Sequence, residues 1–220
     1  MEEIVILGAG GFAREVQWLI ERINQHELAC TGKERWNLIG FIDIGEPIGT
    51  LINGMPVIGD DEYLINRKES LAVVCATASP RLRKKIIGKV MDNANLSFPN
   101  LIDPSVHFSK CINWGKGNII CANTIITVNI SLADFCIVNL SCTIGHDVQI
   151  SSYVTVYPTV NISGNVNIGE CVEIGTGSQI IQGKTIGQNA IIGAGSVVVK
   201  DIPSNCTALG VPCKAIKFNK

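Results

Sequence analysis

The stretch Val138-Asn139-Leu140-Ser141-Cys142-Thr143-Ile144-Gly145-His146-Asp147-Val148-Gln149-Ile150 decides the fold, because an apolar residue returns at every sixth position. This spacing continues without a slip from Ile102 to Val198, and all 17 anchor residues in the register are apolar. A second stripe, two residues before each anchor, consists mostly of small or β-branched side chains. A fixed short period indicates a solenoid, and β-branched residues favour strands over a helix.

Three six-residue faces make a triangular coil of 18 residues, so residues 102–198 supply a little over five coils with the anchors inside. A right-handed parallel β-helix is the structural alternative, although its coils are less regular in length. Glycine often follows the anchor, and we expect corners with tight or positive-φ backbone at those positions. The glycines concerned are Gly145, Gly169, Gly175, Gly187 and Gly193.

The first hundred residues alternate between strand and helix patterns. Glu3–Leu7, Trp36–Asp43 and Leu71–Ala76 are short apolar runs of buried-strand length. Apolar residues at helical spacing follow from Phe12 onward and again over Pro80–Met91. This order predicts a small parallel sheet with helices packed on it.

A glycine turn, Gly8-Ala9-Gly10-Gly11, joins the first strand to the first helix. Glycines at a helix N-terminus let the backbone approach a phosphate, although Ala13 replaces the third glycine of the dinucleotide pattern. A domain of this length favours one nucleotide or a nucleotide sugar over a whole NAD, and Asp43 could hold a ribose hydroxyl. The alternative is a tight connection that binds no ligand.

The helix over Pro80–Met91 has an apolar face and a basic face. We expect the basic residues to lie on solvated surface. They are Arg81, Arg83, Lys84, Lys85 and Lys89.

Composition excludes several classes of protein. Hydrophobic residues make up 46% of the 220 residues and the net charge is −1, so we expect neither a nucleic-acid partner nor membrane insertion. No signal-peptide pattern is found at the N-terminus. The nine cysteines show no Cys-x-x-Cys spacing, which predicts reduced thiols in a cytoplasmic protein, no disulfide framework and no metal site.

The segments Ile192–Pro203 and Gly210–Lys214 resemble the left-handed β-helix, hexapeptide-repeat acyltransferases. Residues 3–15, Gly40–Asp43 and Gly59 are similar to one branch of that family, the sialic acid O-acetyltransferases and UDP-amino-sugar N-acetyltransferases. The resemblance implies three parts. Residues 1–100 form an α/β Rossmann-like nucleotide-sugar domain, residues 101–203 form an all-β left-handed parallel β-helix, and residues 204–220 form a C-terminal tail.

The resemblance also implies the function. Members of this branch are homotrimers that use acetyl-CoA, and their catalytic histidine stands in an Ile-x-His-[Asp/Glu] motif matched by His146 and Asp147. Without the resemblance, the position of His146 favours a surface histidine on a flat face of the prism over a catalytic one. The implied reaction is N-acetylation of a nucleotide-linked amino sugar in surface-glycan biosynthesis. The alternatives are O-acetylation of sialic acid or another sugar, and a non-catalytic hexapeptide trimer.

The remaining site residues are carried over by position. Those implied at the sugar-nucleotide site are Gly10, Gly11, Phe12, Asp43, Gly59 and Asn139. Those implied at the acetyl-CoA site are Thr155, Gly175, Thr176, Gly193 and Ala194.

This chain departs from the family pattern at two of these positions. Thr155 stands where the family usually has a second histidine, and Phe12 where a histidine is common. These departures concern the acceptor and the contacts with the acetyl donor, and they leave the proposed base in place.

Acetyl transfer from a thioester needs a base, donors for the oxyanion and alignment of both substrates. His146 suits the base because imidazole titrates near neutral pH. We expect the oxyanion donors to be backbone N–H groups, near Gly164 or from a neighbouring subunit. Cys142 lies in the small-residue stripe and is expected to be buried, which disfavours it as a nucleophile.

Overall fold

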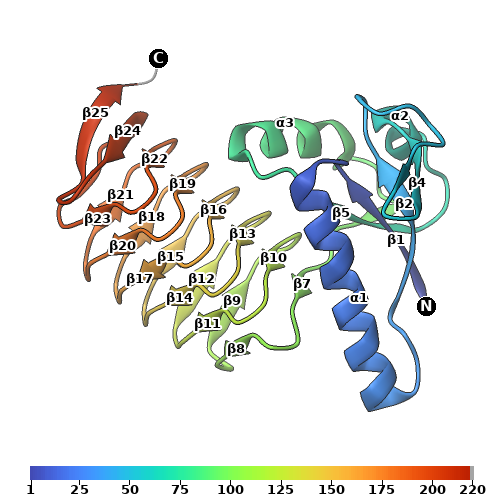
Figure 1. Cartoon of the computed structure of the whole chain (residues 1–220), viewed down its shortest axis with the longest axis horizontal. Coiled ribbons are helices and arrows are strands. Elements are labelled where there is room, and N and C mark those ends of the chain that lie inside the picture. Colours follow the sequence, from blue (N-terminus) through green and yellow to red (C-terminus); the bar gives the residue numbers. More distant parts are fainter. Residues whose placement is uncertain (219–220) are drawn as a thin grey trace. The chain divides into compact units, whose positions relative to one another are not determined.

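The computed structural model describes residues 1–218, and the chain divides into two compact units between Pro104 and Ser105. The first unit is an α/β domain and the second is a parallel β-helix, so the predicted fold class is confirmed. Figure 1 shows the elements of both units along the sequence. Within the described residues, no helix is both long enough and apolar enough to cross a membrane.

A sheet of six strands forms the first unit, in the order β3-β4-β2-β1-β5-β6. All neighbouring pairs are parallel except β3 with β4, and β5 is buried along its whole length. The elements of this unit are β1 (Glu2–Leu7), α1 (Gly11–Thr31), β2 (Trp36–Ile42), β3 (Leu51–Ile52), β4 (Met55–Gly59), α2 (Asp61–Ile65), β5 (Leu71–Cys75), α3 (Pro80–Val90), β6 (Leu96–Ser97) and β7 (Leu101–Ile102).

The direction of strand addition reverses beside β1. The chain runs from β1 to β2 on one side, and β5 is later added on the other side. In open α/β sheets, ligands bind outside the carboxyl ends of the strands at such a switch point. The loops after β1, β2 and β5 are therefore the place where the first unit is expected to bind a ligand.

Gly88 weakens α3, and replacing it should stabilise the first unit. It is exposed in the last turn of the helix, and a Cβ added there meets no atom within 4 Å. Gly88→Ala should raise the free energy of unfolding by about 0.5–1 kcal/mol, measured from the urea midpoint. Gly54→Ala is the matched control. It also has open space, but its φ of +81° should make the substitution destabilising.

Three parallel sheets form the faces of the second unit, and Figure 1 shows their strands stacked along one axis. The first face contains β10 (Ile119–Ile120), β13 (Ile137–Val138), β16 (Thr155–Val156), β19 (Glu173–Ile174), β22 (Ile191–Ile192), β24 (Cys206–Leu209) and the antiparallel β25 (Lys214–Phe218). The second face contains β8 (His107–Phe108), β11 (Ile125–Ile126), β14 (Thr143–Ile144), β17 (Asn161–Ile162), β20 (Gln179–Ile180) and β23 (Val197–Val198). The third face contains β9 (Ile112–Trp114), β12 (Ile130–Leu132), β15 (Gln149–Ile150), β18 (Asn167–Ile168) and β21 (Thr185–Ile186).

The coils repeat every 18 residues, as the six-residue period predicts. Thr143 pairs with Asn161, and Asn161 pairs in turn with Gln179. Both stripes point inward, and the anchor Ile144 and the stripe residue Val148 are each 0% exposed. The β-helix is therefore a filled prism with an apolar core.

The expectation that every anchor lies inside is wrong for the first coil. Phe108 is 50% exposed and forms an edge-to-face pair with Trp114, with their ring centroids 5.5 Å apart. Within the described residues of the second unit, no earlier coil stacks on these rings. The first coil of the β-helix thus carries large aromatic anchors in place of the aliphatic anchors of the later coils.

The expected conformation at the corners is also wrong. The glycine after an anchor does not carry the positive φ; a residue three positions after the anchor does, for example Asp147 at 59° and Asn165 at 54°. Glycine after the anchor has another cause. A Cβ on Gly175 would lie 2.5 Å from the backbone nitrogen of Ala194 in the next coil. These glycines therefore permit close stacking of the coils.

Candidate active site

His146 lies in the turn between the second and third faces, directly after β14; we refer to this edge of the prism as the His146 corner. Its side chain is 52% exposed. Asp147 takes the left-handed position of the turn, a conformation that aspartate and asparagine tolerate better than other residues with a side chain. The regular corner therefore presents the two side chains outward and next to each other.

The imidazole and the carboxylate are hydrogen bonded. Nδ1 of His146 lies 2.8 Å from Oδ2 of Asp147, and the Asn129 amide of the preceding coil donates to Oδ1 at 3.2 Å. The bonds from His146 and then from Asn129 lower the pKa of Asp147 below its usual value. An ionised carboxylate only accepts, so Nδ1 donates this bond, and in the neutral imidazole the lone pair is on Nε2. Nε2 is thus free to act as a base.

Gly164 of the next coil lies directly against the imidazole. A Cβ at this position would lie 2.5 Å from Cε1 of His146 and still closer to Nε2. Gly145 is constrained in the same way, because its Cβ would lie 2.7 Å from the backbone nitrogen of Gly164. Gly145 thus allows the two coils to stack, and Gly164 allows the imidazole to keep its position.

The residues predicted to bind acetyl-CoA occupy a different edge. Gly175 and Thr176 follow β19, and Gly193 and Ala194 follow β22, in the turns between the first and second faces; we refer to this edge as the Gly175 corner. Thr176 and Ala194 are exposed there. Since the second face separates the two corners, one chain alone does not bring these residues to His146.

Two further predicted residues are buried. Thr155 lies on β16 of the first face and is 1% exposed. Asn139 is 7% exposed, and its side-chain oxygen accepts from the backbone N–H of Leu140 at 2.7 Å. The structure therefore gives Asn139 a role in holding its own turn.

Cys142 is buried in the core of the β-helix, as predicted. Its thiol donates to the carbonyl oxygen of Tyr157 at 3.2 Å, and burial raises its pKa to about 11. The thiol is protonated at neutral pH, so it is a structural residue and not a nucleophile.

The glycine turn of the first unit is open where the resemblance implies ligand contacts. Gly8 needs glycine because its φ is +107°, whereas a Cβ on Gly10 would meet no atom within 4 Å. Gly11 begins α1, whose N-terminus has no side-chain cap. The absence of packing around Gly10 leaves the helix N-terminus accessible, and Phe12 beside it is half-buried.

Asp43 and Gly59 have structural roles at this edge of the sheet. The Asp43 carboxylate accepts from the backbone N–H groups of Ala9 and Gly45, at 2.9 and 2.7 Å. Gly59 is buried, and a Cβ there would lie 2.6 Å from the Cβ of Tyr63. Asp43 thus joins the loops after β1 and β2, while Gly59 makes room for a tyrosine.

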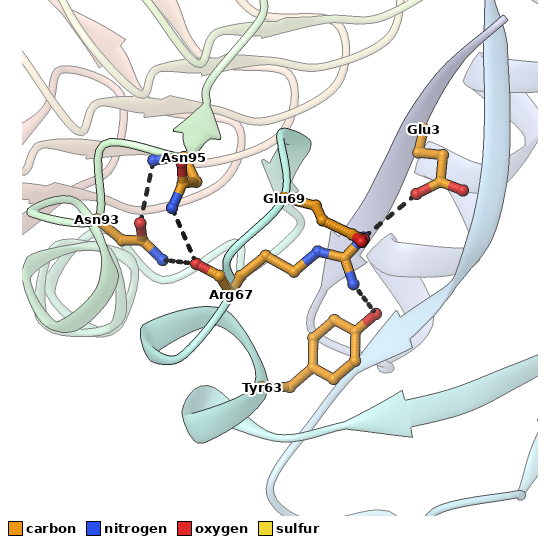
Figure 2. Close-up of polar contacts among 6 residues, drawn as sticks. All are labelled: Glu3, Tyr63, Arg67, Glu69, Asn93 and Asn95. Atoms are coloured by element: carbon orange, nitrogen blue, oxygen red, sulfur yellow. Dashed lines mark hydrogen bonds and ion pairs between the residues drawn. The ribbon is translucent and has the colours of Figure 1, made fainter.

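A polar cluster holds that tyrosine. Figure 2 shows the Arg67 guanidinium between Tyr63 and the carboxylates of Glu3 and Glu69. Arg67 donates to the Tyr63 hydroxyl at 3.1 Å, and its nitrogen lies 3.1 Å from Glu69 and 3.4 Å from Glu3. Since Tyr63 belongs to α2, the cluster fixes this short helix beside the sheet.

A cavity of about 220 Å³ lies at the carboxyl ends of β1, β2 and β5, at the switch point of the sheet. Its polar lining residues are Asp43, Asp61, Thr77, Lys85 and Lys89, and Lys89 forms an ion pair with Asp61 at 2.5 Å. Both lysines are exposed, as predicted, but the sequence pattern did not indicate that they border a cavity. Within the described residues, no cluster of His, Cys, Asp and Glu is arranged to hold a metal ion.

The chain was compared with known proteins. The PglD N-terminal domain family matches residues 3–90, and no curated protein sequence matches the chain. The structure of PerB from Caulobacter crescentus in complex with CoA and GDP-perosamine is 30% identical, with a TM-score of 0.81 and 98% of each chain covered.

Two further solved structures are similar. A mutant perosamine N-acetyltransferase from Caulobacter crescentus, in complex with CoA and GDP-perosamine, is 29% identical, with a TM-score of 0.82 and coverage of 98% of this chain and 97% of that chain. The acetyltransferase domain of PglB from Neisseria gonorrhoeae FA1090, in complex with acetyl coenzyme A, is also 29% identical. Its TM-score is 0.83, with coverage of 98% and 99%.

Proposed function

Because this chain belongs to the left-handed β-helix, hexapeptide-repeat acetyltransferases, in the branch of sialic acid O-acetyltransferases and UDP-amino-sugar N-acetyltransferases, we propose that it acetylates the amine of a nucleotide-linked amino sugar. Acetyl-CoA is the donor, and the product belongs to surface-glycan biosynthesis in the cytoplasm. The observation that carries this proposal is the exposed His146–Asp147 pair on a β-helix that follows a domain with a cavity at its switch point.

The reaction is a direct acyl transfer. The neutral amine of the sugar attacks the thioester carbonyl, and Nε2 of His146 takes the proton that the new C–N bond makes acidic. The tetrahedral intermediate then expels CoA as the C–S bond breaks, and the imidazolium returns its proton to the departing sulfur. Asp147 holds the ring in the required tautomer and stabilises the imidazolium.

The oxyanion of the intermediate needs donors that are already in place. Gly164 lies against the imidazole, and within the described part of the chain its N–H donates to no acceptor. Gly164 is buried, so we propose its N–H as an oxyanion donor only together with donors of a neighbouring subunit.

The active enzyme is proposed to be a homotrimer. His146 and the exposed Thr176 and Ala194 lie at different corners of the prism. A neighbouring copy that brings its Gly175 corner to the His146 corner of the first would complete a site for acetyl-CoA. Gly193 also lies at the Gly175 corner, whereas Thr155, also carried over to the donor site, is 1% exposed.

The first domain, residues 1–100, is proposed to hold the nucleotide. Gly10, Gly11 and Phe12 surround the open N-terminus of α1, which suits a phosphate. Asp43 and Gly59 shape the loops beside the cavity.

In the β-helix, proposed to comprise residues 101–203, Asn139 supports its own turn. Residues 204–220 form the C-terminal tail.

A panel of nucleotide sugars tests the proposed function. Each compound is assayed for a thermal shift of the whole protein and then, with acetyl-CoA, for release of free CoA. A nucleotide amino sugar should give both signals, and mass spectrometry should place the acetyl group on nitrogen. Release with a hydroxyl acceptor only would indicate the O-acetyltransferase instead. Absence of release with every compound would support a non-catalytic trimer.

Asp147→Asn isolates the role of the carboxylate. Asparagine keeps the left-handed turn but removes the charge, so the protein should fold normally while kcat falls about 10- to 100-fold. Because the pKa of Asp147 is lowered, its carboxylate is ionised in the wild type at neutral pH, so the loss should be present there. The measurement is a pH–rate profile of both proteins, and an unchanged kcat would contradict the assignment.

A further inference from the structure

Arg83 is a buried charge that the proposed chemistry does not use. It lies on α3, is 1% exposed and is the largest of the fully buried side chains. Removing a guanidinium from water is costly unless it is hydrogen bonded, and an apolar side chain of similar volume is often tolerated as well or better. Packing alone therefore does not account for a guanidinium at this position.

The guanidinium holds the loop between β5 and α3. Nη1 of Arg83 donates to the carbonyl oxygens of Thr77 at 2.6 Å and of Ala78 at 3.0 Å. Thr77 lines the cavity at the switch point, so these bonds set the position of one cavity wall.

That wall touches the glycine turn. A Cβ at Gly8 would lie 3.4 Å from Oγ1 of Thr77, so the loop after β5 and the turn after β1 are in contact. On the opposite side, Asp43 accepts a hydrogen bond from Ala9. The glycine turn is thus held on both sides. Asp43 contacts it from the β2 side, and Thr77 contacts it from the β5 side, where Arg83 fixes the loop.

The surroundings suit an anionic ligand. Lys85 and Lys89 of the same helix line the cavity together with two carboxylates, Asp43 and Asp61. Asp61 is paired with Lys89, and Asp43 accepts from two backbone N–H groups, so Lys85 and the Arg83 guanidinium behind the wall provide the positive charge. The open N-terminus of α1 contributes the positive end of a helix dipole. A nucleotide sugar carries its negative charge on a diphosphate, which this arrangement would attract.

We propose that Arg83 is a positioning residue of the nucleotide-sugar site, which it serves by fixing the Thr77–Ala78 loop and through it the glycine turn. This inference rests on the proposed function. The bonds of Arg83 are to the loop beside the cavity, so it acts on binding of the nucleotide sugar and not on the transfer step.

Steady-state kinetics of the full chain test the inference. Arg83→Met should raise KM for the nucleotide amino sugar about tenfold, while kcat and the KM for acetyl-CoA stay within about twofold. Arg83→Lys, which keeps the charge and donors, should recover part of the loss. Arg81→Met, an exposed arginine of the same helix, is the matched control and should behave as the wild type.

Several outcomes would overturn the inference. An unchanged KM for the sugar in Arg83→Met, or a loss confined to kcat, contradicts a positioning role. If Arg83→Met does not fold, Arg83→Lys and Arg83→Gln decide by the same split between KM and kcat. An active wild type with normal variants refutes this inference alone, whereas a wild type that neither binds nor acetylates any nucleotide sugar refutes the proposed function as well.

Discussion

Replacement of His146 by alanine should lower kcat for acetyl transfer by about 10²- to 10⁴-fold, the usual contribution of a general base. Nε2 is the free nitrogen of the imidazole, since Nδ1 is bonded to Asp147, and the alanine variant would have no group to accept the proton of the amine. The KM values should change little, because the loss lies in the transition state. The measurement is CoA release under saturating concentrations of both substrates.

The matched control is His107→Ala. His107 is an exposed histidine on β8 of the same second face, but it has no carboxylate beside it in the sequence. Its loss should leave kcat unchanged. Melting temperature and oligomeric state of both variants are compared with the wild type, since the exposed imidazole contributes little to the fold. Full activity in His146→Ala would mean that another group removes the proton.

The β-helix was predictable because one physical rule is repeated many times. Each inward position must be apolar or small, so a register read from Val138, Ile144 and Ile150 extends through the whole unit. The rule does not hold at the first coil, where the anchor Phe108 is exposed. The rule does not apply at the corners either. The left-handed position is occupied by Phe135, Ser141 and Cys171 as well as by asparagines, so no residue type identifies this position in the sequence.

Only the part of the candidate site that is contiguous in the sequence could be predicted. Adjacency in sequence indicates the pair of His146 and Asp147, and their hydrogen bond is present. Contacts between coils are hidden in the sequence until the period is applied. Adding 18 to His146 gives Gly164, and subtracting 18 from Asp147 gives Asn129, the two residues that contact the pair. This simple step would have found both.

The cavity of the first unit was harder to predict from the sequence. A helical pattern separates an apolar face from a polar face, but it does not show which polar residues meet a cavity at the end of a sheet. Lys85 and Lys89 were therefore assigned to solvent, and Arg83 was assigned with them although it is buried. Arg83 is bonded to the loop after β5, whereas Lys89 pairs with Asp61 and Lys85 lines the cavity.

Gly164→Ala should lower kcat about 100-fold while leaving the fold intact, because the new methyl group would occupy the space of the imidazole. The atoms that it meets belong to a side chain that can rotate, so the His146 ring moves and the coils do not. Rotation of the ring breaks its bond with Asp147 and displaces Nε2 from the amine. The backbone N–H at position 164 is kept, so the loss reports the position of the base.

Gln182→Ala provides the control, since Gln182 occupies the equivalent position of the next coil, 18 residues after Gly164, and is exposed. The thermal melts of both variants should resemble that of the wild type. The histidine resonances in the NMR spectrum should show the displaced ring in Gly164→Ala only. A fully active Gly164→Ala protein would mean that the imidazole does not act from the position seen here, because the ring and the added methyl group cannot share that space.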